Sequence, residues 1–151
     1  MSSVYEDLIV TGVDAIDAED AIRQVGRYLL KAGFVKDSYI DAVAQREKEY
    51  PTGLQLKDMG VAMPHTAGVH VNIPAVCIAK LAHPVTFYHM GDPDTRVEAE
   101  MLFMMAIQNP DAHLETLQKV MGVFTNSAAM AEFKAANDKA ALYQVAQTYI
   151  G

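Results

Sequence analysis

The sequence predicts a single α/β domain built in layers, on three observations. Segments with helical periodicity occupy both ends of the chain, short and nearly continuous apolar runs lie between them, and no repeat or long linker divides the 151 residues. A chain of this length buries about two-thirds of the surface that its unfolded form exposes. We therefore expect residues 1–151 to form one domain with its own core.

Two amphipathic helices are expected in the first third of the chain. The first covers residues 17–32, because apolar residues recur at helical spacing, Asp17 can cap its start and Gly33 follows its end. The second covers residues 38–50 and is broken by the Pro-Thr-Gly segment that follows. One face of this second helix carries four residues that include a cation, so that cation is expected to point toward other elements: Tyr39, Val43, Arg46 and Tyr50.

Three apolar runs in the middle of the chain are expected to form strands. They cover residues 61–63, 75–81 and 101–107. The last two are nearly continuous, which indicates strands covered on both faces. Periodicity alone does not exclude a buried helix over 101–107, because Met, Leu and Ala are helix formers. Its length and the Asn109-Pro110 stop that follows favour a strand.

The last third of the chain is expected to be helical. Asn109 as N-cap and Pro110 at the first helical position open a helix that runs to Phe124. We expect its inner side to carry Leu114, Leu117, Met121 and Phe124. Two shorter helices follow, one after Asn126 or Ser127 and one after Asn137 or Asp138.

Composition excludes several classes of function. Twelve basic and nineteen acidic side chains give a formal charge of −7, which disfavours nucleic acid or an anionic membrane surface as the main partner. The chain has no run of eighteen uncharged apolar residues and no secretory signal. Its single cysteine, Cys77, cannot form an internal disulfide, lies in an apolar run and is expected in the core. We expect a cytoplasmic protein.

The five histidines are most simply ordinary surface or partly buried residues, and His83 and His89 keep this interpretation. His65 and His70, with Cys77, can also be interpreted as a metal site. That signal is weak, because neither a Cys-x-x-Cys pair nor a His-Glu-x-x-His helix is present to complete a zinc shell. We expect no metal and no cofactor.

His65 differs from the other histidines in its position. Pro64 ends strand pairing and holds the next residue in a defined direction at the end of the sheet. His113 falls near the start of a helix, where free N–H groups favour an anion. Together with Arg46, these imidazoles suit a phosphoryl group: one attacks, and the other groups balance the charge on its oxygens. Thr66 is a further candidate for a hydrogen bond to phosphate.

The segment from Arg46 to Thr66, REKEYPTGLQLKDMGVAMPHT, resembles the signature of enzyme IIA domains of the fructose–mannitol family, from the bacterial phosphoenolpyruvate-dependent sugar phosphotransferase system. Those domains carry an Arg-Glu pair, a Thr-Gly and a Gly-Ile-Ala-Ile-Pro-His segment. The leading helix, HPVTF, the apolar strand, NPDAHLETLQKV and the closing helices follow the family's order. EYPTG and the long connection to Gly60 are most similar to the galactitol-type branch.

The resemblance implies a mixed sheet between helices and a role for each matching residue. His65 matches the histidine that accepts a phosphoryl group on Nε2 from the carrier protein HPr. His113 matches a hydrogen-bond donor to that group, Arg46 matches the arginine that neutralises its charge, and Glu47 is the adjoining, supporting acid. The phosphoryl group then passes to a cysteine of enzyme IIB and finally to a sugar or polyol at the membrane component, enzyme IIC.

Three functions remain open on the sequence. The favoured one is a phosphocarrier for uptake of a galactitol-like sugar or polyol. The second is a regulatory protein of the nitrogen-related enzyme IIA kind, whose phosphorylation state controls binding to other proteins. The third is a metal-dependent hydrolase that uses His65 and His70. The long connection between Thr52 and Gly60 favours the first over the second.

Overall fold

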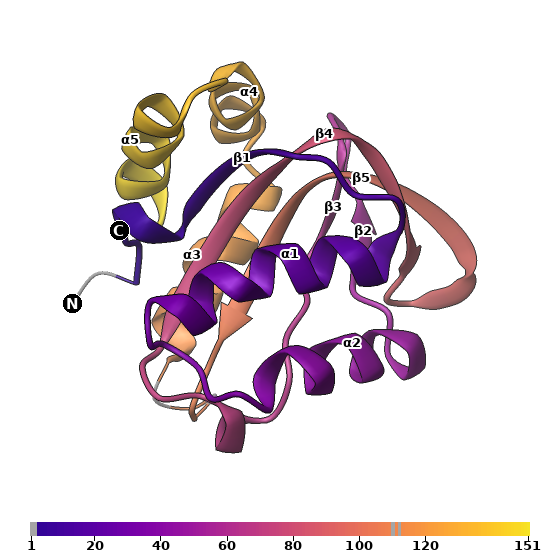
Figure 1. Cartoon of the computed structure of the whole chain (residues 1–151). Coiled ribbons are helices and arrows are strands. Elements are labelled where there is room, and N and C mark those ends of the chain that lie inside the picture. Colours follow the sequence, from indigo (N-terminus) through magenta and orange to yellow (C-terminus); the bar gives the residue numbers. More distant parts are fainter. Residues whose placement is uncertain (1–2, 110, 112) are drawn as a thin grey trace.

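The computed structural model describes residues 3–109, 111 and 113–151. In this part of the chain a five-stranded mixed sheet separates two groups of helices, with α1 and α2 on one face and α3, α4 and α5 on the other (Figure 1). The predicted α/β class is confirmed. Within the same residues, every helix is too short or too polar to cross a membrane.

Helices α1 (Ala18–Lys31) and α2 (Tyr39–Glu49) agree with the two predicted helices. The side chain of Asp17 accepts a hydrogen bond from Asp20 N–H at 2.8 Å and so caps α1. Gly33, one residue past the C-cap, has a φ of +83°, a conformation that favours glycine. Local sequence signals therefore fix both ends of α1.

The sheet has the strand order β1–β4–β2–β3–β5, and β4 also pairs with β5. Its strands are β1 (Ile9–Val13), β2 (Gly53–Gln55), β3 (Gly60–Ala62), β4 (Ala75–His89) and β5 (Asp92–Ala106). The sequence predicted neither β1 nor β2, and the predicted strands over 75–81 and 101–107 are only half of β4 and β5. The short antiparallel β2–β3 hairpin lies between the long strands: β3 runs parallel to β5, and β2 meets β4 where Gly53 pairs with His89.

Alternate residues of β4 and β5 enter the two opposite cores. On β4, Cys77 packs with α1 and α2, whereas Val76 and Ile78 pack with the C-terminal helices. On β5, Leu102 and Phe103 divide in the same way. This period of two confirms that both runs are strands covered on both faces.

The C-terminal helices are α3 (Leu114–Phe124), α4 (Ser127–Ala135) and α5 (Lys139–Tyr149). The two shorter ones agree with prediction, and Asn126 and Asp138 cap them. The predicted start of α3 is wrong: regular helix begins after His113, and the side chain of Asn109 instead accepts a bond from Asp111 N–H at 3.0 Å. Pro110 lies outside the described residues.

The predicted inner side of α3 is also partly wrong. Leu114 is 54% exposed and Met121 is 44% exposed, whereas the buried side consists of Val120, Val123 and Phe124. Leu114 in the first turn is therefore exposed, and the C-terminal half of the helix supplies the residues that are buried in the core. Leu117 is half-buried between these two parts.

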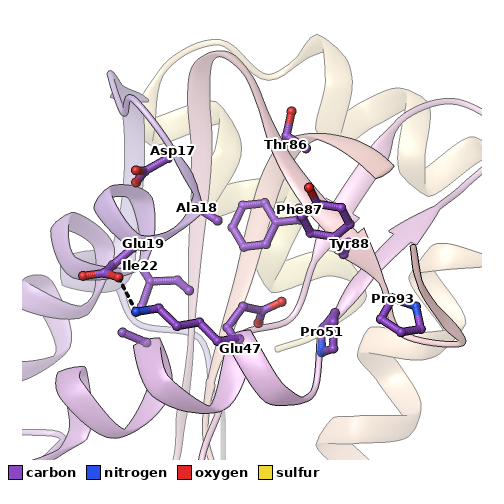
Figure 2. Close-up of a pocket in the computed structure, with 12 residues that line it drawn as sticks. Asp17, Ala18, Glu19, Ile22, Glu47, Pro51, Thr86, Phe87, Tyr88 and Pro93 are labelled. Carbon is purple, nitrogen blue, oxygen red and sulfur yellow. Dashed lines mark ion pairs between the residues drawn. The ribbon is translucent and has the colours of Figure 1, made fainter. Parts of the chain in front are cut away.

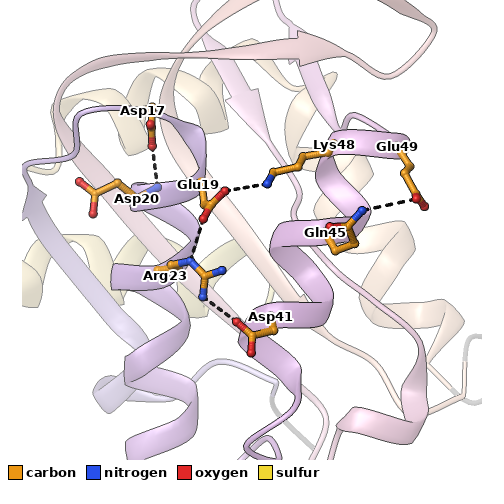
Figure 3. A network of polar contacts seen from close by, with 8 residues as sticks. All are labelled: Asp17, Glu19, Asp20, Arg23, Asp41, Gln45, Lys48 and Glu49. Carbon is orange, nitrogen blue, oxygen red and sulfur yellow. Dashed lines mark hydrogen bonds and ion pairs between the residues drawn. The ribbon is translucent and has the colours of Figure 1, made fainter.

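A polar network holds α1 against α2 (Figure 3). Glu19 of α1 pairs with Lys48 of α2 at 3.0 Å and with Arg23 at 3.1 Å, and Arg23 pairs with Asp41 of α2 at 2.8 Å. Exposed ion pairs contribute little to stability. We therefore infer that the main effect of this network is to align α2 along α1. That alignment matters because α2 carries Arg46 and Glu47 in its last turn.

Candidate active site

His65 lies on a backbone segment that is hydrogen-bonded on both sides. Met63 N–H donates to the carbonyl oxygen of Thr52 at 3.3 Å and to its hydroxyl at 3.2 Å. Met105 N–H of β5 donates to the carbonyl oxygen of Pro64 at 3.0 Å. Pro64 is buried and has no N–H, so pairing with β2 ends here and the chain holds His65 at the end of the sheet.

The hydrogen bond of His65 fixes its tautomer. Nδ1 lies 2.8 Å from the carbonyl oxygen of Met63. A carbonyl oxygen only accepts, so Nδ1 carries the hydrogen and Nε2 of the neutral ring keeps its lone pair. Burial lowers the pKa of His65; the bond to Met63 opposes this effect, and the nearby charge of Arg46 adds to it. The lowered pKa favours the neutral ring, which is the form that attacks an electrophile.

Arg46 is a half-buried cation in the last turn of α2. Its guanidinium carbon lies 5.2 Å from the centre of the Tyr50 ring, so the side chain rests on an aromatic face. Its charge is near enough to lower the pKa of His65. The structure therefore brings Arg46 and His65, from α2 and the segment after β3, into one electrostatic environment.

A cavity of about 260 Å³ opens beside His65. Its walls come from the segment after β3, the end of β5 and α3: Met63, His65, Thr66, Ala67, Gly68, Met105, Ile107 and Leu117. Thr66 therefore shares this cavity with His65. His113 is the N-cap residue of α3, one helical turn before Leu117. Within the residues described, no hydrogen bond or ion pair joins His113 to His65.

Glu47 points away from this cavity and binds Thr52. One carboxylate oxygen accepts from Thr52 N–H at 2.7 Å, and the other accepts from the Thr52 hydroxyl at 2.8 Å. Burial raises the pKa of Glu47 to about 7, while the two bonds from Thr52 and the charge of Arg46 act in the opposite direction. Both oxygens are occupied, so Glu47 acts on its neighbours within the protein.

A larger cavity, of about 620 Å³, lies between α1, the C-terminal end of α2 and the β4–β5 hairpin (Figure 2). Asp17, Glu19 and Glu47 contribute carboxylates to its lining. Its cation, Lys48, is paired with Glu19 at 3.0 Å. A phosphoryl group carries negative charge and is repelled by such a lining, whereas no carboxylate is among the described residues that line the smaller cavity beside His65.

The remaining histidines and the cysteine lie elsewhere. His70 Nδ1 is 2.7 Å from the Ser38 hydroxyl, and His83 Nε2 is 3.0 Å from Asp14. Cys77 is completely buried, which confirms its predicted place in the core, and burial raises its pKa to about 12. In the described ranges, no three His, Cys, Asp or Glu side chains are grouped in a way that could hold a metal ion.

The sequence analysis gave no role in the site to two residues that contact its backbone. Thr52 is a buried polar side chain, 3% exposed, that links Glu47 to Met63. Tyr39 is fully buried, and its hydroxyl donates to the carbonyl oxygen of Met105 at 2.7 Å. The shared helix face of Tyr39 and Arg46 was a usable signal for the contact of Tyr39. Nothing in the pattern signalled the contact of Thr52 with Met63, because it depends on the β2–β3 hairpin.

Known proteins resemble this chain in sequence and in fold. The chain matches the family model "Phosphoenolpyruvate-dependent sugar phosphotransferase system, EIIA 2" over residues 3–148. It is 27% identical over 112 residues to the "PTS system galactitol-specific EIIA component" of Escherichia coli K12, with 74% of each chain covered.

Two solved structures have the same fold. One is the complex of enzyme IIA-Mtl and phosphorylated enzyme IIB-Mtl from E. coli, with a TM-score of 0.75, 21% identity and coverage of 94% of this chain and 95% of that chain. The other is the nitrogen regulatory protein IIA-Ntr from Neisseria meningitidis, with a TM-score of 0.72, 19% identity and 95% of each chain covered. At these identities the likeness establishes the fold, and function has to be argued from the site.

Proposed function

Because the chain belongs to the EIIA 2 family of the phosphoenolpyruvate-dependent sugar phosphotransferase system, we propose that it is a phosphocarrier that accepts a phosphoryl group on Nε2 of His65. EIIA components are phosphotransferases, and the chain is one of them. The donor is the phosphohistidine of HPr, and the acceptor is a cysteine of an enzyme IIB partner. Enzyme IIC takes part indirectly, when the sugar receives the phosphoryl group at the membrane.

The bond from His65 Nδ1 to the Met63 carbonyl oxygen is the observation that supports this proposal most strongly. The lone pair of Nε2 forms a new N–P bond while the N–P bond of the donor imidazole breaks and its electron pair returns to the donor nitrogen. The donor leaves as a neutral imidazole. The hydrogen on Nδ1 stays in its bond to Met63, where the carbonyl oxygen stabilises the positive character of the phosphorylated ring.

The other site residues support the phosphoryl oxygens. Arg46 offers a planar guanidinium that can donate two parallel hydrogen bonds, and its contact with Tyr50 holds it in place. We assign His113, at the N-terminus of α3, and Thr66, in the same cavity as His65, to hydrogen bonds with the same group. Glu47 supports the site from behind through Thr52.

Exposed apolar side chains beside the site suit a partner surface. Val69, in the loop after His65, is 68% exposed, and Leu114, in the first turn of α3, is 54% exposed. A partner that covers them excludes water from the phosphoryl group during transfer. The structure of a related IIA with phosphorylated IIB supports enzyme IIB as one such partner.

The transported substrate is proposed as a galactitol-like polyol or sugar, on the 27% identity to the galactitol-specific relative. The alternative is a regulatory role of the IIA-Ntr kind, because a protein with that title has the same fold. The two proposals differ in what happens after His65 is phosphorylated. A carrier passes the group to enzyme IIB, whereas a regulator retains it and changes its protein partners.

The decisive experiment follows the phosphoryl group through both steps. The protein is incubated with phosphoenolpyruvate, enzyme I and HPr, and intact mass with site mapping is expected to show one acid-labile phosphoryl group on His65. Purified galactitol-type enzyme IIB is then added, and loss of that mass with a gain on IIB supports the carrier. Retention on His65 favours the regulator. No phosphorylation, with a working control IIA, overturns the transfer from HPr to His65 and moves the regulatory proposal ahead of the carrier.

A further inference from the structure

A hydrogen-bonded path leads from Glu47 to the imidazole of His65 through two intervening residues. Both oxygens of Glu47 accept from Thr52, at 2.7 Å from its N–H and 2.8 Å from its hydroxyl. Thr52 in turn accepts the N–H of Met63, and the carbonyl oxygen of Met63 accepts Nδ1–H of His65 at 2.8 Å. Each contact is short enough to be an ordinary hydrogen bond.

With Glu47 ionised, the direction of every bond in this path is determined. Met63 N–H can only donate, so the Thr52 oxygen is its acceptor, and the Thr52 hydroxyl hydrogen is free to point at Glu47. The carboxylate holds that hydroxyl in the one orientation that leaves a lone pair for Met63. Thr52 is 3% exposed, so water does not compete for these bonds.

The place of the path in the fold explains its effect. Thr52 directly precedes β2 and Met63 directly follows β3, and these strands pair with Gly53 opposite Ala62. Thr52 and Met63 therefore close the open end of a hairpin whose strands are only three residues long. A hairpin this short has little stability of its own. Met63 N–H is shared between the carbonyl oxygen of Thr52 at 3.3 Å and its hydroxyl at 3.2 Å, so the side chain adds a second acceptor that helps to fix the direction of the Met63 carbonyl.

We propose that Thr52 and Glu47 are positioning residues that hold Met63 so that its carbonyl selects the Nδ1–H tautomer of His65 and leaves Nε2 free to accept the phosphoryl group. This inference rests on the proposed function of His65. The two residues act on the reaction through Met63, without touching the phosphoryl group.

The molecule contains a matched control pair. Across β4 and β5, the hydroxyl of Thr86 donates to a carboxylate oxygen of Glu98 at 2.7 Å, which is the same side-chain bond as that between Thr52 and Glu47. This second pair lies at the surface and, among the residues described, makes no hydrogen bond with Met63 or His65. Thr86→Val and Glu98→Gln therefore make the same chemical changes outside the path.

The test measures the tautomer of His65 directly, by nitrogen-15 NMR of its two ring nitrogens. The wild type is expected to show Nδ1 protonated and Nε2 bare. Thr52→Val is expected to show a mixture of both tautomers and an initial rate of phosphorylation lowered about tenfold, with an unchanged KM for phospho-HPr. Thr52→Ser restores both values because it keeps the hydroxyl. Thr86→Val and Glu98→Gln are expected to behave as the wild type.

Glu47→Gln provides a second route if Thr52→Val does not fold. Glutamine has the same size, but while its oxygen accepts from Thr52 N–H its amide nitrogen can only donate to the Thr52 hydroxyl, so the bond that orients this hydroxyl is reversed. A wild-type tautomer in each of Thr52→Val and Glu47→Gln that folds overturns the proposal, as does an equal change in the Thr86 and Glu98 controls. The NMR measurement needs no phosphoryl transfer, so a wild type that HPr fails to phosphorylate refutes the proposed function and leaves this test intact.

Discussion

The two cavities of this molecule differ in the charged groups around them as well as in volume. The smaller one, beside His65, contains the imidazole and lies within the influence of Arg46. The larger one is lined by the carboxylates of Asp17, Glu19 and Glu47 (Figure 2). For a phosphoryl group, the sign of the surrounding charge outweighs the available volume, so the larger cavity is the wrong site for this chemistry.

The strongest test of this difference is His65→Ala. Loss of the attacking nitrogen is expected to abolish phosphoryl acceptance, measured by intact mass after incubation with phospho-HPr. The free energy of unfolding should change by no more than about 1 kcal/mol, because the side chain is only half-buried. His70→Ala, five residues later in the same loop, is the control and should accept normally. Acceptance by His65→Ala near the wild-type rate would show that another residue is the nucleophile.

The charge of Glu47 in the larger cavity predicts a pH effect on stability. Its pKa is about 7 in the folded protein against an ordinary value of 4.5, so the folded state holds the proton more tightly than the unfolded chain. The resulting stabilisation is complete below pH 4.5 and is lost as the pH rises through 7. The difference corresponds to at most about 3 kcal/mol.

Urea unfolding at pH 5, 6, 7 and 8 measures this effect. The wild type is expected to lose stability over this range relative to Glu47→Gln, whose amide does not titrate. Glu98→Gln, at the surface, should follow the wild type. If the curves of the wild type and Glu47→Gln stay parallel, burial has not raised the pKa of Glu47.

Gly68→Ala tests how closely the wall of the smaller cavity is packed. A Cβ at Gly68 would lie 1.9 Å from the carbonyl oxygen of Gln108, so the loop after His65 has to move away from the segment that follows β5. We expect destabilisation of about 2 kcal/mol by urea unfolding, together with slower phosphorylation. Gly122→Ala is the matched control: nothing lies within 4 Å of its new Cβ, and a helical alanine should stabilise by about 1 kcal/mol. Equal stability of both variants would contradict the packing argument.

Arg46→Lys compares two cations in the last turn of α2. A lysine keeps the charge but loses the planar fork, so transfer from phospho-HPr is expected to slow about tenfold, or about 1.4 kcal/mol in barrier. Lys48→Ala removes a cation of the larger cavity that pairs with Glu19, and its transfer rate should remain that of the wild type. The reverse order of effects would place the phosphoryl group nearer Lys48 than Arg46.

The helices could be predicted from the sequence because their signals are local. Asp17 and Gly33 mark the ends of α1 in the sequence itself, and they do so in the structure. The start of α3 was predicted too early, since Asn109 satisfies Asp111 N–H in a turn that resembles a helix cap. The asparagine side chain thus bonds a nearby backbone N–H as expected, but it does so in a turn and not at the start of the helix.

The short and exposed parts of the sheet could not be predicted in this way. Strand β2 has three residues, which is too few to show a period, and it exists because β3 and β4 provide partners. Strand β3, by contrast, agrees with the strand predicted over 61–63. In the outer halves of β4 and β5, Pro84 and Pro93 are residues that normally mark loops. Pairing between distant segments overrides these local preferences.

In the candidate site, too, local features could be predicted and contacts between distant segments could not. The residues expected to carry the chemistry, His65 and Arg46, could be named from residue type and position, because a proline before a histidine and a cation on a buried helix face are visible in the sequence. The residues that hold them, Thr52 and Tyr39, act through hydrogen bonds to backbone atoms of Met63 and Met105. Those partners are set by strand register, which the sequence did not reveal.

Because Cys77 is completely buried, the rate at which its thiol reacts with a reagent measures how often the core around it opens. Its side chain is 0% exposed, so a reagent cannot reach it in the folded protein. Burial also raises its pKa to about 12, so the reactive thiolate does not form there. A maleimide therefore labels only molecules whose core has opened, and the labelling rate reports how often this happens. Each variant described above thus records its own unfolding as one mass increment on its native thiol, without an engineered cysteine.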